Sequence, residues 1–135
     1  MILARLAAVS AATIALMSAQ NAAQIERGRY LVEEVAKCGD CHTPKGADGQ
    51  LDRSKWLKGA VLDFQPLEPV PKWHKTSPDL TRPGRLWSKW GELALLNYLK
   101  TGLAPSGKPA DPPMPAYKLK HEDAEAIVEY LKSLK

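Results

Sequence analysis

The residues best suited to chemistry in this sequence are two cysteines and a histidine that lie close together, in Cys38-Gly39-Asp40-Cys41-His42. Two thiols separated by two residues, with a histidine directly after the second, have the spacing of a c-type haem attachment site. The thiols can add across the two vinyl groups of a haem, and His42 then serves as the proximal ligand of the iron. One short segment would therefore both attach and ligate the cofactor.

Other uses of these cysteines fit the sequence less well. A structural zinc site needs four protein ligands, and the remaining histidines, His74 and His121, lie far from the motif and from each other. A thioredoxin-like redox pair occurs near a βαβ pattern, and no apolar β-branched runs alternate with helices here. A disulfide across so short a loop would stabilise the fold little. Haem attachment is the favoured interpretation, and these three are its alternatives.

The first 23 residues have the features of an export signal. Arg5 supplies a positive charge, an apolar stretch runs from Leu6 to Met17, and small or polar residues follow as far as Gln24. We therefore expect residues 1–23 to be a signal peptide, with no single clear cleavage site. The apolar stretch is shorter than the about 20 residues of a membrane span, which favours a cleaved signal peptide. An uncleaved membrane anchor is the alternative. The expected location is the periplasm, with membrane association through this leader or through a partner.

Residues 24–135 have the length of one small domain. The whole chain has a formal net charge of +4, and its basic and acidic residues are interspersed. This distribution lacks the basic stripe of a nucleic-acid-binding protein, so we expect no nucleic-acid partner. A mildly basic face is still able to steer a redox protein towards the domain.

Three segments of the domain have helical patterns. The segment from Ile25 to Lys37 carries apolar residues at roughly helical spacing and ends at the haem motif. A second helix is expected over 89–100, with Ser88 as its N-cap and Gly102 at a left-handed C-terminal stop. The last helix has the strongest pattern, because five apolar residues form one face: Ala124, Ile127, Val128, Leu131 and Leu134.

The middle of the domain is rich in proline. Six prolines lie between the haem motif and Trp87, which excludes long regular elements there, and only a short helix is expected near Asp52 to Lys58. The predicted fold class is therefore all-α, with three or more helices wrapped around one covalently bound haem. The chain has neither an internal repeat nor a second CxxCH motif, so one haem and one domain are expected.

Met114 is the best candidate for the second axial ligand of the iron. It is the only methionine that remains after loss of the leader, and it lies in the segment DPPMP at 111–115. Three prolines restrict the backbone on both sides, which suits a loop that holds a thioether against a metal. A methionine that only fills a gap in the core is the alternative. The rival ligands, His74 and His121, lie in charged segments without such a rigid frame.

The order of these features resembles that of a known family. A CxxCH motif near the start, a Met-Pro framed by prolines and a closing helix over 127–134 form the pattern of class I cytochrome c domains, and the resemblance covers nearly the whole exported part. It implies the cytochrome c-like fold. In that fold Gly28 would let the last helix cross the first one closely, and Tyr130 and Leu131 would pack at the crossing.

A narrower resemblance concerns the partners. The segments SPDLT at 77–81 and LKTG at 99–102 are similar to segments in the cytochrome subunits of membrane-associated alcohol and sugar dehydrogenases. Those subunits usually carry three haem domains, whereas this chain has one CxxCH motif, and Asp79 stands where an asparagine is common. The resemblance implies a dehydrogenase, an oxidase or another cytochrome as the redox partner.

Together these observations predict a periplasmic monohaem c-type cytochrome that carries single electrons between redox partners by outer-sphere transfer. Its haem c would be attached through Cys38 and Cys41, with His42 as the proximal and Met114 as the distal iron ligand. The other ring nitrogen of His42 is expected to donate to a backbone carbonyl beyond Thr43. Two alternatives are a haem subunit fixed inside a dehydrogenase or oxidase complex, and a five-coordinate haem enzyme or sensor.

Overall fold

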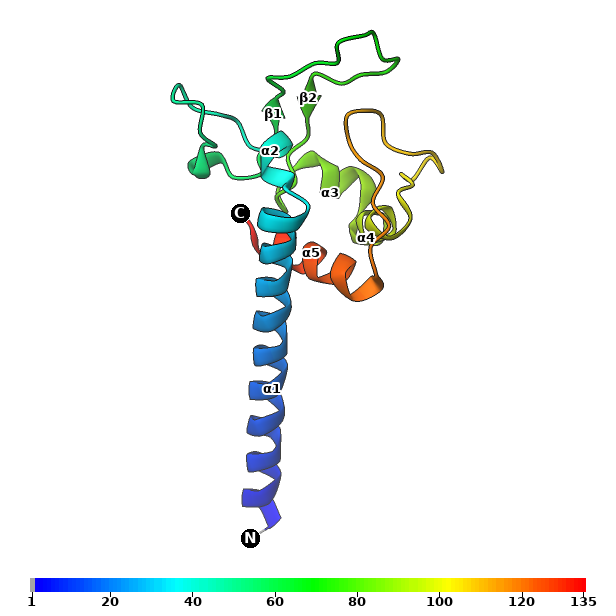
Figure 1. Cartoon of the computed structure of the whole chain (residues 1–135). Helices are drawn as coiled ribbons and strands as arrows, with labels where there is room; N and C mark the ends of the chain where they lie inside the picture. The colour runs from blue at the N-terminus through cyan, green and yellow to red at the C-terminus, as the bar shows by residue number, and fades with distance from the viewer. Residues whose placement is uncertain (1) are drawn as a thin grey trace.

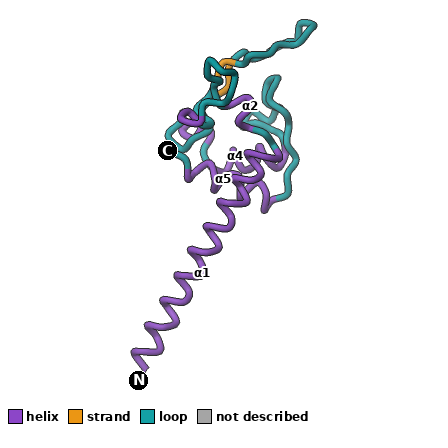
Figure 2. Tube along the Cα trace, turned by 60° about the vertical axis from the view of Figure 1, so that its left-hand side comes forward, coloured by secondary structure: helices purple, strands orange, loops and turns teal. Residues whose placement is uncertain are grey.

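We describe the protein from a computed structural model that covers the backbone of residues 2–135 and the side chains of residues 13–135. Most of the regular structure is helical (Figure 2). In chain order the elements are α1 (Ile2–Tyr30), the π-helical turn η1 (Leu31–Val35), α2 (Cys38–His42), the 3₁₀ turn η2 (Arg53–Lys55), β1 (Ala60–Val61), β2 (Thr76–Ser77), α3 (Arg85–Trp90), α4 (Glu92–Thr101) and α5 (His121–Ser133).

The first part of α1 stands away from the rest of the chain (Figure 1). The expected helix over 25–37 is present as the end of the longer helix α1, which begins at Ile2. The π-helical turn η1 follows it directly. The expected signal peptide falls on this projecting part, and residue 1 and the side chains of 2–12 lie outside the described residues. In the part of the chain that the structure describes, none of the helices combines the length and the apolar character needed to cross a membrane.

Helices α1 and α5 cross at Gly28, as the family resemblance implied. A Cβ atom at this position would overlap the carbonyl oxygen of Ala126 and lie 2.7 Å from Cβ of Tyr130. Only glycine allows the two backbones to come this close. Beside the crossing, Nη2 of Arg27 lies 2.6 Å from a carboxylate oxygen of Asp123. The crossing therefore fixes where α1 delivers the segment that follows it.

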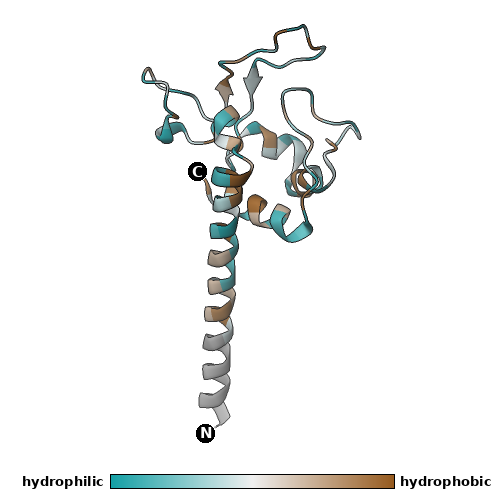
Figure 3. Cartoon of the chain, viewed as in Figure 1, coloured by the Kyte–Doolittle hydropathy of each residue, from teal (hydrophilic) through white to brown (hydrophobic). Residues whose placement is uncertain are grey.

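Helix α5 follows its sequence pattern closely. Hydrophobic and hydrophilic residues alternate along it (Figure 3), and its apolar side chains are buried. Lys120 occupies the N-cap position and makes no capping hydrogen bond through its side chain. The acidic residues in the first turn, Glu122 and Asp123, instead face the positive end of the helix dipole.

The predicted helix over 89–100 is wrong at its start. The chain forms two helices, α3 and α4, which are separated at Gly91, where φ is +76°. Ser88 lies inside α3 and donates from its hydroxyl to the Arg85 carbonyl, so it does not cap a helix. The predicted stop at Gly102 is confirmed, since this residue has φ of +75° and its N–H donates to the Tyr98 carbonyl.

The proline-rich middle contains little regular structure, as expected. The predicted short helix near Asp52 to Lys58 is the 3₁₀ turn η2. The all-α prediction is right in the main, because the one sheet among the described residues is the antiparallel pair β1–β2, with Ala60 opposite Ser77 and Val61 opposite Thr76. The long loop between these strands extends away from the helices (Figures 1 and 2).

A single cluster of buried apolar side chains connects these elements. It joins η1, the loop at Leu57, the segment at Leu80, and helices α3, α4 and α5. Its members are Leu31, Val32, Leu57, Leu80, Trp87, Leu95, Ala126, Ile127, Val128, Tyr130 and Leu131. Leu31 and Val32 lie just before α2, so the core holds the haem motif from its N-terminal side.

Candidate haem site

Helix α2 consists of the CxxCH motif itself. Lys37 precedes it in a left-handed conformation with φ of 51°, and Thr43 ends it in an extended one. Cys38 and Cys41 are both partly buried free thiols. Burial raises the pKa of Cys38 to about 11 and also raises the pKa of Cys41. Both cysteines, as unmodified side chains, are therefore protonated thiols at neutral pH.

The geometry weighs against the other uses of the motif. Cys38 and Cys41 form no disulfide. Among the residues that the structure describes, no group of three or more His, Cys, Asp or Glu side chains converges to hold a metal ion. A zinc site made from the motif thus lacks the additional ligands that it needs.

His42 is held in one orientation by a distant backbone carbonyl. Its side chain is buried, and Nδ1 lies 2.8 Å from the Pro78 carbonyl oxygen. Since a carbonyl only accepts, Nδ1 carries the proton and Nε2 is the nitrogen that can ligate iron. Burial lowers the pKa of His42, and the hydrogen bond to Pro78 opposes that effect. The predicted hydrogen bond to a backbone carbonyl beyond Thr43 is therefore present.

Two segments far along the chain hold the C-terminal end of α2. The carbonyl of His42 accepts from the Gly59 N–H at 2.8 Å, and the Thr43 hydroxyl accepts from the Leu57 N–H at 2.9 Å. The Ser77 hydroxyl donates to the Cys41 carbonyl at 2.5 Å. The carbonyls of Cys41 and His42 at the end of this short helix are thus paired with the protein, and these two residues are held in place.

Trp56 packs against Gly39 of the motif. A Cβ atom at Gly39 would lie 2.5 Å from the Trp56 ring, so a glycine is needed at this position of the motif. The Trp56 indole donates to the Tyr130 hydroxyl at 2.9 Å, and that hydroxyl donates to Glu33 at 3.1 Å. This chain of contacts connects α2 to α5 and to η1.

Met114 lies in a loop whose carbonyls are held from two directions. The Pro112 carbonyl accepts from the His74 N–H at 2.8 Å, and the Pro115 carbonyl accepts from the Tyr98 hydroxyl at 2.7 Å. Met114 itself is partly buried. The structure therefore places this methionine on a separate loop, fixed on both sides, rather than on a helix face of the core.

The two rival histidines lie at the surface. The His74 side chain is 58% exposed, with Nε2 3.2 Å from Asp111, and the His121 side chain is 56% exposed, with Nε2 3.3 Å from Glu125. Each has a carboxylate as its neighbour. Of the three histidines, only His42 is buried, and this distribution favours Met114 over either rival as a second ligand.

The donor set fits a covalently attached haem. Two thiols and one imidazole nitrogen come from the same short helix, α2, and the indole Nε1 of Trp73 is buried without a hydrogen-bond acceptor among the described residues. A buried donor of this kind normally has a partner. Haem carries carboxylates as well as iron, so it can supply one.

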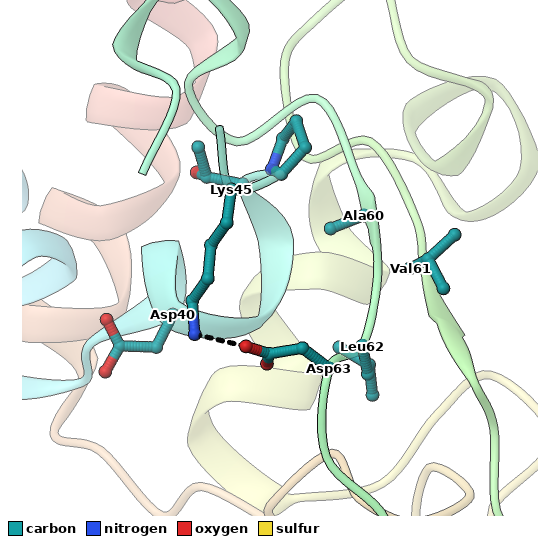
Figure 4. Close-up of a pocket in the computed structure, with 8 residues that line it drawn as sticks. Asp40, Lys45, Ala60, Val61, Leu62 and Asp63 are labelled. Carbon is teal, nitrogen blue, oxygen red and sulfur yellow. Dashed lines mark hydrogen bonds and ion pairs between the residues drawn. The ribbon is translucent and has the colours of Figure 1, made fainter. Parts of the chain in front are cut away.

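A surface pocket of about 280 Å³ lies beside the attachment helix (Figure 4). It is lined by residues from α2, from the segment after His42 and from β1 and the residues behind it. Nζ of Lys45 lies 2.6 Å from Asp63 across it. That hydrogen bond raises the pKa of Lys45 and lowers the pKa of Asp63. The pair joins the segment after His42 to the loop that follows β1.

Several positioning residues were not predicted from the sequence. Pro78 and Ser77 belong to the segment that carried the dehydrogenase resemblance, but no role followed for them from that likeness. Their contacts with α2 depend on the β1–β2 pairing, which has no strong sequence signal. The role of Tyr98 in holding the Met114 loop was not predicted, because a tyrosine within a helical pattern has no sequence signal beyond ordinary packing.

Comparisons with known proteins give matches over most of the chain. The family model described as Cytochrome c matches residues 25–135. A protein named "Diheme cytochrome c-type" from Cereibacter sphaeroides is 41% identical over 113 residues, which are 79% of this chain and 34% of the relative. The fructose dehydrogenase cytochrome subunit of Gluconobacter japonicus is 35% identical over 114 residues, or 80% of this chain and 21% of the relative.

A third relative has a similar name. The cytochrome c subunit of the quinone-dependent alcohol dehydrogenase of Gluconobacter oxydans is 31% identical over 124 residues, which are 82% of this chain and 24% of the relative. The chain therefore spans about a third or less of the length of these three curated relatives.

Proposed function

Since the chain belongs to the cytochrome c family, we propose that residues 24–135 are a periplasmic domain that carries single electrons between redox proteins through one haem. The family consists of electron-transfer haem proteins with covalently bound haem c, not of catalytic enzymes, and this sets aside the five-coordinate enzyme. The number of haems, the location and the partner are parts of the proposal.

The proposed haem is attached through Cys38 and Cys41, with His42 as its proximal iron ligand. The observation that carries this proposal is the buried imidazole of His42, whose Nδ1 is occupied by the Pro78 carbonyl at 2.8 Å. When bound, the haem iron supplies the one-electron chemistry by changing between its ferrous and ferric states. The protein's part is to hold Nε2 of His42 in place and to keep water away from it.

Met114 is the proposed distal ligand. Its thioether favours ferrous iron and so raises the reduction potential relative to a second nitrogen ligand. The hydrogen bonds of His74 and Tyr98 to the carbonyls of Pro112 and Pro115 support this assignment, because they hold the methionine's loop on both sides. A ligand held in this way leaves no open position at the iron for oxygen or peroxide.

A second candidate is a haem subunit that works inside a dehydrogenase complex. The names of several relatives favour it, since they are cytochrome subunits of fructose, alcohol and gluconate dehydrogenases. Under this proposal the redox partner is a large enzyme that oxidises an alcohol or sugar. The projecting part of α1, or the partner itself, would bring the domain to the membrane.

The test is to express the full chain, with its leader, in a bacterium that has haem-maturation machinery. We expect a coloured periplasmic fraction whose haem stays with the polypeptide in acidified acetone, at one haem per chain by pyridine haemochrome assay. The ferric protein should show the weak long-wavelength absorption band of methionine ligation. Colourless protein, or haem that the acetone extracts, would contradict the proposal. Co-purification with a large dehydrogenase would favour the second candidate.

A further inference from the structure

We propose that the side-chain pair of His74 and Asp111 positions the loop of Met114 in a pH-dependent way, so that the loop is held less firmly as the pH rises through neutrality. This inference rests on the proposed role of Met114 as the distal iron ligand. It gives a positioning role to two surface side chains, one in the long loop between β1 and β2 and one in the segment just before Met114.

The first observation is that His74 holds the Met114 loop through two bonds. Its backbone N–H donates to the Pro112 carbonyl at 2.8 Å, and its ring nitrogen Nε2 lies 3.2 Å from Oδ2 of Asp111. The Asp111 carbonyl in turn accepts from the Met114 N–H at 3.3 Å. Asp111 therefore connects the His74 ring to the residue that carries the proposed ligand.

The second observation concerns the charges around this pair. Among the side chains that the structure describes, Asp111 has two cationic partners: His74 and Lys72, whose Nζ lies 3.9 Å from the other carboxylate oxygen. The remaining charged residues of the β1–β2 loop and of the loop 103–119 are Asp63, Glu68, Lys75, Lys108 and Lys118.

The group that changes charge near neutrality is the imidazole. Carboxylates and lysine ammonium groups ordinarily keep their charge between about pH 5 and 8, whereas an imidazole ordinarily loses its charge within this range. At the acidic end the contact of His74 with Asp111 is an ion pair, and at the alkaline end it is a hydrogen bond from a neutral ring. A charge-assisted hydrogen bond is the stronger of the two, so the contact weakens as the pH rises.

The third observation is that the other side of the loop is held independently of pH in this range. The Tyr98 hydroxyl donates to the Pro115 carbonyl at 2.7 Å, and burial raises the pKa of Tyr98 above the ordinary value of about 10. This hydroxyl therefore keeps its proton well beyond neutrality. A rise in pH weakens the contact before Met114 and leaves the contact after it unchanged.

A less firmly held loop should favour ferric iron. A thioether ligand favours the ferrous state, so methionine ligation is lost more readily from ferric protein when the loop moves. The loss of a positive charge on His74 acts in the same direction, because a nearby cation disfavours the more positively charged ferric state. Since the pair is exposed and such pairs contribute little, we expect an effect of about twofold between about pH 5 and 8.

The main test measures the reduction potential of haem-loaded His74→Gln and His74→Arg at pH 5 and pH 8. The potential of the unsubstituted protein should fall by about 18 mV more than that of either variant, which is a twofold change at 59 mV per tenfold. Any titration of the haem carboxylates is common to all these proteins and cancels in the comparison. At pH 8 the potential of His74→Arg should exceed that of His74→Gln, because a guanidinium stays charged.

The matched control is His121→Gln. The His121 side chain is 56% exposed, against 58% for His74, and its Nε2 lies 3.3 Å from Glu125. Both members of that pair belong to α5, so the pair joins no loop to another segment. The pH profile of His121→Gln should match that of the unsubstituted protein.

A second measurement follows the His74 amide proton by hydrogen exchange in ferrous protein, a readout that does not involve the potential. Asp111→Asn should speed this exchange about twofold at pH 5 and by less at pH 8. Equal potential profiles in His74→Gln and the unsubstituted protein, or exchange in Asp111→Asn that is unchanged at both pH values, would overturn the inference. Failure of the proposed distal ligand is distinct, because the unsubstituted protein would then lack the methionine band already at pH 5.

Discussion

The two sides of the proposed haem site are supported in different ways. The proximal side is α2 with the segments 57–59 and 77–78, and the distal side is the loop 111–117. On the proximal side, His42 is buried and its ring and its backbone carbonyl are both paired, to Pro78 and Gly59. On the distal side, Met114 is only partly buried and its own N–H donates to the Asp111 carbonyl at 3.3 Å within the loop. The hydrogen bonds from outside the loop reach its neighbours Pro112 and Pro115.

This difference indicates that the proximal side determines haem attachment, whereas the distal side adjusts the reduction potential. The proximal side is closely paired with buried backbone groups, so a change there removes several contacts at once. The distal loop is held by a few contacts from α4 and from the segment of His74, so it can shift without loss of the fold. We therefore expect proximal substitutions to change how much haem is bound, and distal substitutions to change its potential.

The largest effect is expected for His42→Ala. It removes the proposed iron ligand and leaves the Pro78 carbonyl without its donor, a loss of about 1–3 kcal/mol in folding free energy. Haem content per chain should fall by about tenfold or more, as measured by haem staining and pyridine haemochrome assay of equal amounts of protein. His121→Ala, at an exposed position, should keep the normal content. Full haem content in His42→Ala would refute the proximal assignment.

Met114→Ala should separate the two sides most clearly. Covalent haem should stay at the normal level, because no proximal contact changes. The potential should fall by about 59 mV or more, a tenfold shift towards the ferric state, and ferric protein should lose its long-wavelength band. Potentiometric titration measures the reduction potential of this variant and of His74→Ala, the matched change in a rival ligand. A large fall in His74→Ala with none in Met114→Ala would reverse the assignment.

The same division explains how much of the molecule could be predicted from its sequence. The CxxCH motif and the amphipathic face of α5 are local patterns, and each is present. The close crossing at Gly28, also present, was implied by the family resemblance. The Pro-framed loop of Met114 was also recognisable. These features depend on residue types at short spacing. The regular period of a helix places residues at such spacing on one face or in one turn.

What could not be predicted depends on long-range contacts. The left-handed conformations of Lys37 and Leu57 have no clear local signal, since neither residue is glycine. Leu57 keeps φ of 58° because its N–H and its carbonyl are both paired, to Thr43 and to the Leu80 N–H. Such tertiary contacts override the local backbone preference of a residue. They also place the Pro78 carbonyl against the His42 ring.

A smaller effect is expected for Tyr98→Phe on the distal side. The change removes the hydroxyl that donates to the Pro115 carbonyl at 2.7 Å and keeps the ring packed against Trp90. We expect a loss of about 1 kcal/mol in unfolding free energy and a weaker methionine band, with haem content unchanged. Denaturant unfolding and the ferric spectrum check both. Reduced haem content would show that the two sides are not separable in this way.

The smallest effect is expected at Tyr117, where the two sides meet. Its hydroxyl donates at 3.3 Å to the carbonyl of Ala36, shortly before the haem motif. Burial raises the pKa of Tyr117 to about 12, above the ordinary value of about 10. The folded state therefore binds this proton more tightly than the unfolded state. The stability that it contributes is complete below about pH 10 and is lost as the pH rises through about 12.

Tyr117→Phe removes this dependence, because phenylalanine cannot ionise. Between about pH 10 and pH 12 its free energy of unfolding should fall less than that of the unsubstituted protein, as measured by denaturant unfolding across that range. Tyr30→Phe is the control, since Tyr30 is exposed on α1, and its alkaline loss of stability should match the unsubstituted protein. Equal losses in all three proteins would mean that the contact between the distal loop and Ala36 opens before Tyr117 titrates, and the two sides would then respond to alkali independently.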